Sequence, residues 1–272
     1  AERMAAMLGE KPGETIGYLT RLDSKRSAKT RVTVLTEAIF LNRIVADPEL
    51  SGVSAVLFDE AHERHLDSDF GLALALETQG VLRDDLRLLV MSATLDGERF
   101  AGLMNDCPVI ESEGRSHPLR IEWLGASGTQ RFEEAMADAV AQAWRAEEGD
   151  ILAFLPGARE IQRTAEQLET VPDNVRVAPL FGALSPAEQD AAVSPAPEGM
   201  RKIVLATDIA ESALTIEGVR IVIDSGLSRV AEEAAGGLGT RLSTVKASRA
   251  SVDQRRGRAG RLSPGVCYRL WD

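Results

Sequence analysis

Cysteine, aromatic residues and long apolar runs are all scarce in this chain of 272 residues. The two cysteines, Cys107 and Cys267, supply neither a disulfide framework nor a metal-ligand cluster, and we expect two small buried thiols in a reducing cytosol. Because aromatic residues make up only 4% of the chain, Leu, Val, Ile and Ala must form the cores. No uncharged apolar stretch is long enough to span a membrane, and the N-terminus does not resemble a signal peptide. These shortages favour a cytoplasmic protein without a membrane partner.

Positive charge is also in short supply. The net charge is −11 and the isoelectric point is about 4.9, which argues against a protein that coats itself with nucleic acid. A groove with concentrated arginine and backbone donors inside an acidic surface is still compatible with these values. Four arginines fall within the eight residues Gln254–Arg261. The basic loop Asp23–Thr30 is either a solvated connection or a contact with a phosphate backbone.

The length is roughly twice that of a usual single domain, so two domains are the default expectation. Strand-like apolar runs alternate with helix-like segments, which is typical of α/β domains with parallel sheets. The polar stretch Glu111–Pro118 is the candidate connection, and we predict domains over residues 1–114 and 115–272. The chain opens at Ala1 without an initiator methionine and closes directly after a strand-like run, so we expect a piece of a longer protein. The segment Ser228–Ala247 suits a β-hairpin, with a flexible surface loop as the alternative.

The strongest candidate for chemistry is the stretch Val53–Arg64, in which a short apolar run ends in two adjacent carboxylates. Asp59 and Glu60 follow Ala55–Phe58, which we expect to be a buried strand of a parallel sheet. Such a pair can divide the work of phosphoryl transfer: one acid holds Mg²⁺ through its water shell, and the other positions or deprotonates the attacking water. A solvated turn is the alternative, because acid pairs are common after strands.

A second apolar run, Leu86–Met91, ends in the polar triplet Ser92-Ala93-Thr94. Right-handed crossovers bring the carboxyl ends of parallel strands to one edge of a sheet. We therefore expect Ser92 and Thr94 to be neighbours of Asp59 and Glu60.

The arginine-rich segment Gln254–Arg261 is the other strong candidate. On a helix, Gln254, Arg258 and Arg261 would share a face at spacings of four and three. Like charges packed this closely repel one another, so we infer an anion clamp in which guanidinium groups stabilise the terminal phosphate of a nucleotide. A solvated basic face is the alternative.

Together these motifs resemble those of the DEAH-box helicases of superfamily two. The ordered set is Asp59-Glu60-Ala61-His62, Ser92-Ala93-Thr94, Phe154-Leu155-Pro156-Gly157, Ala206 to Ile216, and Gln254 to Arg261. Closer detail is similar to the bacterial HrpB type, in the segments Leu88–Gly97, Gly182–Ser185 and Gly265–Trp271. The resemblance implies two tandem RecA-like domains, the first truncated at its N-terminus. It also implies a motor that uses ATP or another NTP with Mg²⁺ to move along single-stranded RNA or another nucleic acid.

The resemblance further implies a role for each matching residue. Asp59 and Glu60 would serve Mg²⁺ and the attacking water, and His62 would couple them to Gln254. The groups that face the γ-phosphate would be Gln254, Arg258 and Arg261. Ser92 and Thr94 would link hydrolysis to domain movement. The resemblance also implies that Thr36, Gly157 and Thr207 lie along the RNA path and that Glu217 lies near the ribose. It further implies that Arg3 stacks on adenine and that the hairpin separates strands.

Parts of the family pattern are missing from the sequence. It contains no Gly-x-x-x-x-Gly-Lys-Ser/Thr loop, the motif that cradles nucleotide phosphates. We therefore expect this chain by itself to bind ATP poorly and to hydrolyse it negligibly, and the parent protein to do both. Val193 stands where the family has an adenine-stacking aromatic residue, which leaves the choice of NTP open. The family's C-terminal accessory domains are missing as well.

Two rival functions follow from these departures. One is a nucleic-acid-binding or scaffold protein that has lost catalysis, which the missing phosphate loop favours and the retained acids and arginines disfavour. The other is a nucleotide switch or a nuclease-associated ATPase that unwinds nothing.

Overall fold

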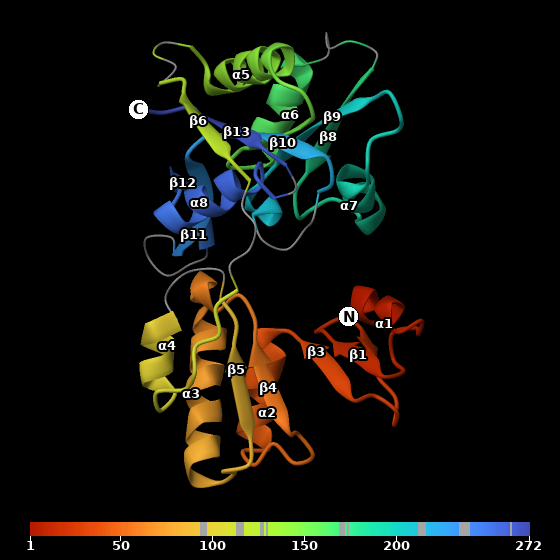
Figure 1. The fold of residues 1–272 in the computed structure, drawn as a ribbon, viewed down its shortest axis with the longest axis vertical. Helices are drawn as coiled ribbons and strands as arrows, with labels where there is room; N and C mark the ends of the chain where they lie inside the picture. Colours follow the sequence, from red (N-terminus) through yellow and green to blue (C-terminus); the bar gives the residue numbers. More distant parts are fainter. Residues whose placement is uncertain are drawn as a thin grey trace. The chain divides into compact units, whose positions relative to one another are not determined.

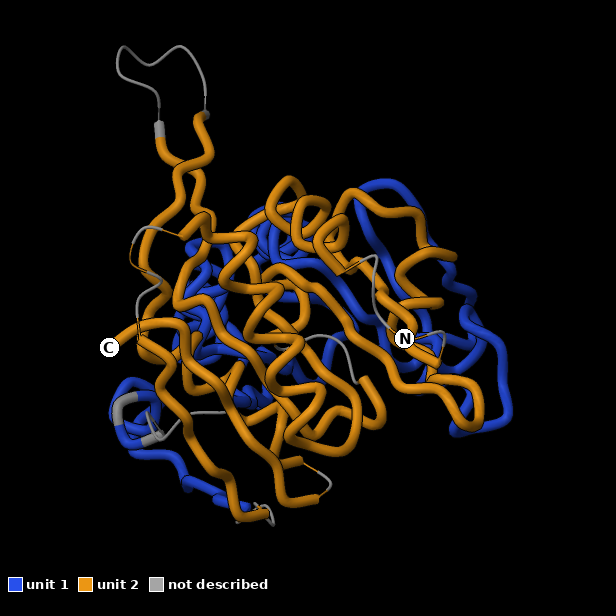
Figure 2. Tube along the Cα trace, turned by 90° about the horizontal axis from the view of Figure 1, so that it is seen from above, with its two compact units in different colours: residues 1–112 blue, residues 113–272 orange. Residues whose placement is uncertain are grey.

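The computed structural model describes residues 1–92, 97–112, 117–125, 128, 130–168, 172, 174–211, 216–233, 240–261 and 263–272. The chain divides into two compact units, residues 1–112 and 113–272, which Figure 2 distinguishes by colour. The boundary predicted from the sequence, between residues 114 and 115, falls among residues outside the described part and stays a prediction.

Unit 1 contains two small sheets and the helices that accompany them (Figure 1). Its elements are α1 (Glu2–Met7), β1 (Ile16–Leu19), β2 (Ser24–Lys25), β3 (Val32–Leu35), α2 (Glu37–Ala46), β4 (Ala55–Phe58), the 3₁₀ turn η1 (Ala61–Glu63), α3 (Leu66–Val81), β5 (Arg87–Val90) and α4 (Gly97–Leu103). In the first sheet β1 pairs with β3 in parallel and with β2 in antiparallel fashion. In the second, β4 and β5 run parallel with Phe58 opposite Val90.

The core of unit 1 lies between α2, α3 and one face of the β4–β5 sheet. Phe40 and Phe58 meet edge to face with ring centroids 5.5 Å apart, and Leu72 packs into the same cluster. The expectation that Ala55–Phe58 is a buried strand is wrong for its other face, where Leu57 is 58% exposed. Ala55 and Leu57 are both exposed, so the described residues leave this face without the second helical layer that buries central parallel strands.

Unit 2 is built on a six-stranded parallel sheet in the order β6-β13-β10-β7-β9-β8 (Figure 1). Its elements are β6 (Leu119–Trp123), α5 (Phe132–Ala146), β7 (Asp150–Phe154), α6 (Ala158–Gln167), β8 (Val175–Leu180), α7 (Pro186–Val193), β9 (Arg201–Ala206), η2 (Asp208–Ala210), β10 (Val219–Asp224), β11 (Leu227–Glu233), β12 (Thr240–Lys246), α8 (Arg249–Gly257) and β13 (Gly265–Arg269). The expected α/β class with a RecA-like parallel sheet is confirmed.

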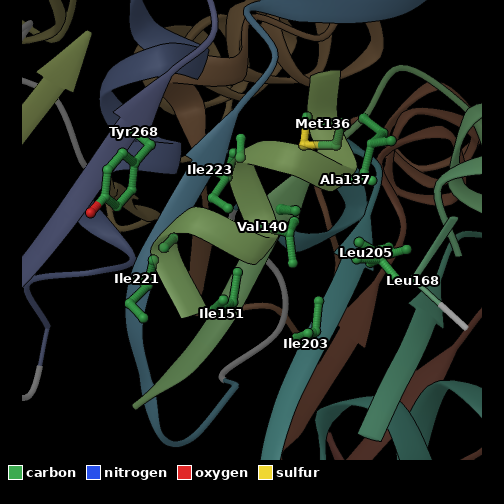
Figure 3. Packing of buried hydrophobic residues seen from close by; sticks show 14 of the residues in the cluster. Met136, Ala137, Val140, Ile151, Leu168, Ile203, Leu205, Ile221, Ile223 and Tyr268 are labelled. Atoms are coloured by element: carbon green, nitrogen blue, oxygen red, sulfur yellow. The ribbon is translucent and has the colours of Figure 1, made fainter. Parts of the chain in front are cut away.

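Side chains of the central strands alternate between two apolar layers because successive residues of a strand point to opposite faces. Ile151 and Ala153 of β7 face α5 and α6, where Met136 and Val140 complete the cluster in Figure 3. The alternate residues of β7 face the layer that contains Ala192 of α7. Both faces of the sheet are therefore covered, and β7 is buried along its whole length.

Local signals fix several element ends in unit 2. Ser185 caps α7 in a reciprocal capping box with Glu188, and Pro186 occupies the first helical turn. The hairpin predicted over Ser228–Ala247 is confirmed, since β11 and β12 pair antiparallel over seven residue pairs. Its turn, residues 234–239, lies outside the described residues.

The cysteines only partly follow their prediction. Cys267 is buried in the central strand β13, whereas Cys107 is only half-buried in the segment after α4, so the expectation of two buried thiols is wrong for Cys107. Burial and the nearby Asp224 carboxylate raise the pKa of the Cys267 thiol to about 12.

Candidate functional site

The acid pair of unit 1 stands where β4 and β5 end side by side. Beyond the Phe58–Val90 pair, the Met91 N–H donates to the Phe58 carbonyl at 2.8 Å, and the Ala61 N–H donates to the Met91 carbonyl at 3.0 Å. These bonds hold the turn with Asp59 and Glu60 against the segment that leads to Ser92. The register therefore puts the acids and Ser92 at one edge of the sheet, while Thr94 lies outside the described residues.

The backbone of this turn is locally strained. Glu60 has a φ of 51° and Arg64 a φ of 55°, on either side of η1. Residues other than glycine pay on the order of 1 kcal/mol or more for this left-handed conformation, and they are concentrated at functional sites. The two left-handed residues turn the polypeptide sharply at the end of β4. Asp59 stays exposed and the Glu60 side chain is 41% exposed.

His62 belongs to the same turn but lies inward. Its side chain is only 4% exposed, and its Nε2 atom is 3.5 Å from the Glu60 carboxylate. The arrangement gives Glu60 one neighbouring imidazole and one side open to solvent, so the carboxylate is restrained without being covered.

The start of α2 lies close to the acid turn. His65, directly before α3, has its Nδ1 atom 3.8 Å from the Glu37 carboxylate and its Nε2 atom 3.5 Å from that of Glu63. Glu37 is the first residue of α2 and follows Thr36, which is exposed at the N-cap. Unit 1 thus places Thr36 and the acid turn on neighbouring segments.

In unit 2 the predicted backbone-binding residues follow adjacent strands. Phe154 of β7 pairs with Ala206 of β9, and three residues later Gly157 caps α6, while Thr207 follows Ala206 directly. The Leu155 N–H donates to the Ala206 carbonyl at 2.8 Å, which extends the pairing beyond the strand ends. Gly157 and Thr207 therefore lie at one edge of the sheet, the carboxyl edge.

The three residues predicted for the RNA path share one structural feature. Thr36, Gly157 and Thr207 are the N-caps of α2, α6 and η2, and none of them makes a side-chain capping hydrogen bond. The first N–H groups of a helix have no partner within it, so these positions present backbone donors. By contrast, Ser185 and Ser248 cap α7 and α8 with their own hydroxyl groups.

Gly157 is also a point of close approach. A Cβ atom there would lie 2.3 Å from Nη1 of Arg229 and 2.9 Å from Oε2 of Glu160. Arg229 of β11 forms an ion pair with Glu160 of α6 at 3.3 Å. The absence of a side chain at Gly157 therefore lets the hairpin attach to the start of α6.

The arginine-rich segment does not form one continuous helix. Helix α8 ends at Gly257 with Arg258 as its C-cap, so Arg261 lies beyond the helix. The predicted helical face shared with Gln254 is wrong for Arg261, because Gly257 and Gly260 weaken the helix here. Arg258 is 5% exposed and its Nε donates to the Glu211 carbonyl at 2.8 Å, whereas Arg261 is exposed.

Arg255 is a residue that the sequence reasoning did not single out. It is 1% exposed and ion-paired with Glu211 at 2.6 Å and with Asp224 at 3.0 Å. The available signal was its spacing from Val252 and Ala259, three residues before it and four after it, which places it on the face toward the core. Burial raises the pKa of Asp224, and the charge of Arg255 acts in the opposite direction.

The residues predicted to contact adenine and ribose are Arg3 and Glu217. Arg3 is exposed on α1. Glu217 is exposed in the turn before β10, at the opposite end of that strand from Asp224. The structure therefore does not group Glu217 with the residues of the carboxyl edge.

No group of three or more His, Cys, Asp or Glu side chains in the described ranges could hold a metal ion. Likewise, none of the helices described has the length and apolar character needed to cross a membrane.

Comparisons with known proteins agree with the motifs. Residues 133–263 match the family model of the helicase conserved C-terminal domain. The ATP-dependent RNA helicase HrpB of Escherichia coli is 50% identical over 99% of this chain and 34% of its own length. The ATP-dependent RNA helicase HrpA of the same organism is 39% identical over 100% of this chain and 21% of its own length.

Solved structures give the same result. The crystal structure of the E. coli DExH-box NTPase HrpB superimposes with a TM-score of 0.90 at 49% identity, covering 100% of this chain and 34% of that one. The chain thus spans about a third of the length of HrpB and about a fifth of that of HrpA. By its motifs, its fold and these matches, the chain belongs to the DEAH-box helicase family and, within it, to the HrpB type.

Proposed function

We propose that this chain is part of an NTP-dependent helicase that hydrolyses ATP or another NTP with Mg²⁺ and moves along single-stranded RNA. The observation that carries the proposal is the strained turn at the end of β4, where Asp59 and Glu60 are presented to solvent while backbone bonds fix them to β5. A turn that only connected two elements would not need two adjacent carboxylates open to solvent, one of them on a left-handed residue, Glu60.

Asp59 and Glu60 fit the requirements of Mg²⁺. Their carboxylate oxygens are hard ligands that reach solvent, and Mg²⁺ keeps several water ligands and takes others from the substrate phosphates. The two acids would hold the ion, which neutralises charge on the phosphates when bound. Glu60 would position the attacking water, and His62 would restrain Glu60.

We assign the arginine-rich segment of unit 2 to the γ-phosphate. Gln254, Arg258 and Arg261 supply donors that stabilise charge on the transferred group. Ser92 and Thr94 would connect hydrolysis to movement. Arg3 and Glu217 remain proposals for adenine and ribose.

The nucleic-acid contacts would be made by backbone donors and hydroxyl groups. Uncapped helix starts at Thr36 and Gly157, together with Thr207, suit phosphate oxygens and carry no sequence information. HrpB of E. coli is named as an RNA helicase, which supports RNA as the substrate. A cytoplasmic location also remains a proposal, and so does negligible NTP hydrolysis by residues 1–272 alone.

Glu60→Gln in the full-length protein tests the catalytic assignment. The substitution keeps the shape of the side chain but removes the base, so we expect RNA-stimulated NTP hydrolysis to fall by about 100-fold or more. Binding of a labelled single-stranded RNA should stay close to that of the wild type. Glu63→Gln in the same turn is the matched control and should retain hydrolysis. Undiminished hydrolysis by Glu60→Gln would remove Glu60 from the mechanism.

Strand displacement separates the proposal from its rivals. A duplex with a single-stranded overhang should be unwound only with NTP and Mg²⁺, and EDTA should stop the reaction. A scaffold protein would neither hydrolyse NTP nor unwind, whereas a nucleotide switch would hydrolyse NTP and leave the duplex intact.

A further inference from the structure

Arg255 makes an unusually large number of contacts for one buried side chain. Its guanidinium forms four hydrogen bonds: Nε with the Glu211 carboxylate at 2.6 Å, Nη1 with the Asp224 carboxylate and the Leu227 carbonyl at 3.0 Å each, and Nη2 with the Ser228 hydroxyl at 2.7 Å. The partners belong to the end of η2, the end of β10 and the start of β11. A single planar group on α8 thus joins three other segments of unit 2.

The chemistry of the group makes this junction stiff. A guanidinium holds its donors in a fixed plane, so four simultaneous bonds fix the relative positions of their acceptors, which a lysine ammonium could not do. The side chain of Arg255 is 1% exposed, that of Asp224 is 0% exposed and that of Glu211 is 13% exposed. Water is therefore largely excluded from competing with these bonds, which strengthens them.

The junction lies between two functional parts of unit 2. On one side, Gln254 precedes Arg255 in α8, and Arg258 follows about one turn later. The Arg258 Nε atom donates a hydrogen bond to the Glu211 carbonyl at 2.8 Å. On the other side, Leu227 and Ser228 are the first residues of the hairpin strand β11. The helix that carries Gln254 and ends at the C-cap Arg258 is thereby bonded directly to the base of the hairpin.

We propose that Arg255 is a positioning residue that couples the phosphate-facing end of α8 to the β11–β12 hairpin. A shift of α8 carries the guanidinium with it, and the bonds to Leu227 and Ser228 transfer that shift to the base of the hairpin. The inference rests on the proposed function, which assigns the γ-phosphate to one side of the junction, and on the strand separation that the family resemblance implies for the hairpin on the other side.

Ser228 offers a mild way to test the junction. Ser228→Ala in the full-length protein removes only the hydroxyl that accepts from Nη2, and both carboxylate pairs of Arg255 remain. We expect RNA-stimulated NTP hydrolysis to stay within about twofold of the wild type, while the number of duplexes opened per NTP consumed falls about threefold or more. The melting temperature should change by about 3 °C or less.

Two further variants complete the test. Ser228→Thr keeps a hydroxyl acceptor and should restore the wild-type ratio of unwinding to hydrolysis. Ser194→Ala is the matched control, because the Ser194 hydroxyl bonds to the Asp190 carbonyl at the end of α7, away from the junction. It should leave the ratio unchanged.

The possible failures are distinguishable. A wild-type protein that neither hydrolyses NTP nor opens duplexes would contradict the proposed function. An active wild-type protein whose ratio is unaltered in Ser228→Ala would overturn the coupling role alone. A proportional loss of hydrolysis and unwinding in Ser228→Ala would also overturn it, since that result is what a purely structural contact produces.

Discussion

The positively charged guanidinium of Arg255 is almost completely buried, and the carboxylates of Glu211 and Asp224 stabilise it there. Transfer of an unpaired charge from water to such a site is very costly, so each member of the group depends on the others. Asp224 depends most on the arrangement because it is fully buried and its Oδ2 atom has no hydrogen-bond partner. Its Oδ1 atom accepts from Arg255 and from the Gly226 N–H.

Arg255→Met should therefore destabilise unit 2 by roughly 3–5 kcal/mol at pH 7, because it leaves Asp224 buried without its countercharge. The pKa of Asp224 is already raised by burial, and loss of Arg255 raises it further. A folded-state pKa above the unfolded value means that the cost appears as pH rises through it and is relieved as pH falls. The deficit relative to wild type should therefore shrink between pH 7 and pH 5.

Denaturant unfolding followed by tryptophan fluorescence measures this deficit, since Trp123, Trp144 and Trp271 all lie in unit 2. Asp224→Asn in the Arg255→Met background should abolish the pH-dependent part. A deficit that stays constant or widens at pH 5 would contradict the assignment of the cost to Asp224.

The same residue shows where sequence reasoning reaches its limit. Asp59 and Glu60 could be predicted because the strand, the turn and the acids are contiguous in the chain. The ion pairs of Arg255 could not be predicted, because its partners Glu211 and Asp224 lie 44 and 31 residues away. Charge repulsion within Gln254–Arg261 indicates a bound anion for the whole arginine cluster. In the folded chain, however, Glu211 and Asp224 supply the negative charge for Arg255.

At the scale of elements, the start of α6 combines features that normally exclude each other. A helix N-terminus carries partial positive charge, yet the Arg229 guanidinium of β11 lies directly against Gly157. The Glu160 carboxylate in the first turn offsets the positive charge of the helix N-terminus and that of Arg229. Its side chain is 17% exposed, and that of its ion-pair partner Arg229 is 31% exposed. The hairpin is therefore attached to unit 2 at Arg229 as well as at Arg255.

Gly157→Ala should disturb this attachment by displacing Arg229. The extended φ of −168° accepts any residue, so steric contact is the only obstacle to the substitution. We expect a loss of about 1 kcal/mol from unit 2, and less than half as much in an Arg229→Ala background, where only the flexible Glu160 carboxylate still lies close. Tryptophan fluorescence in denaturant gives both values. Equal losses in the two backgrounds would show that contact with Arg229 does not explain the need for glycine at position 157.

Elements differ in how far the sequence predicts them. The hairpin and α5 follow from local alternation and from a clear apolar stripe. The end of α8 was extended too far because spacing rules apply only while a helix continues, and Gly257 ends it. The exposure of Leu57 is not predicted because an apolar run does not reveal whether helices will cover both faces of its sheet.

At the scale of the whole molecule, an acidic chain is proposed to hold an acidic polymer. The net charge of −11 argues against general electrostatic attraction as the source of affinity. Gly157 has the Arg229 guanidinium beside it, but the contacts proposed at Thr36 and Thr207 avoid this conflict because they are made by uncharged donors at helix starts. Such donors position a phosphate without the release of counterions that accompanies lysine and arginine contacts.

The salt dependence of RNA binding distinguishes these two modes. Each phosphate neutralised by a cation on a single strand contributes about −0.7 to the slope of log affinity against log salt. With mostly uncharged contacts we expect a slope shallower than about −2, so that an increase from 50 to 200 mM KCl weakens binding by less than about 16-fold. Fluorescence anisotropy with a labelled single-stranded RNA measures the slope for this chain. Arg26→Ala combined with Lys29→Ala, in the exposed loop Asp23–Thr30, should leave it unchanged. A steep slope that becomes shallower in this double variant would move the main RNA contact from the helix starts to the basic loop.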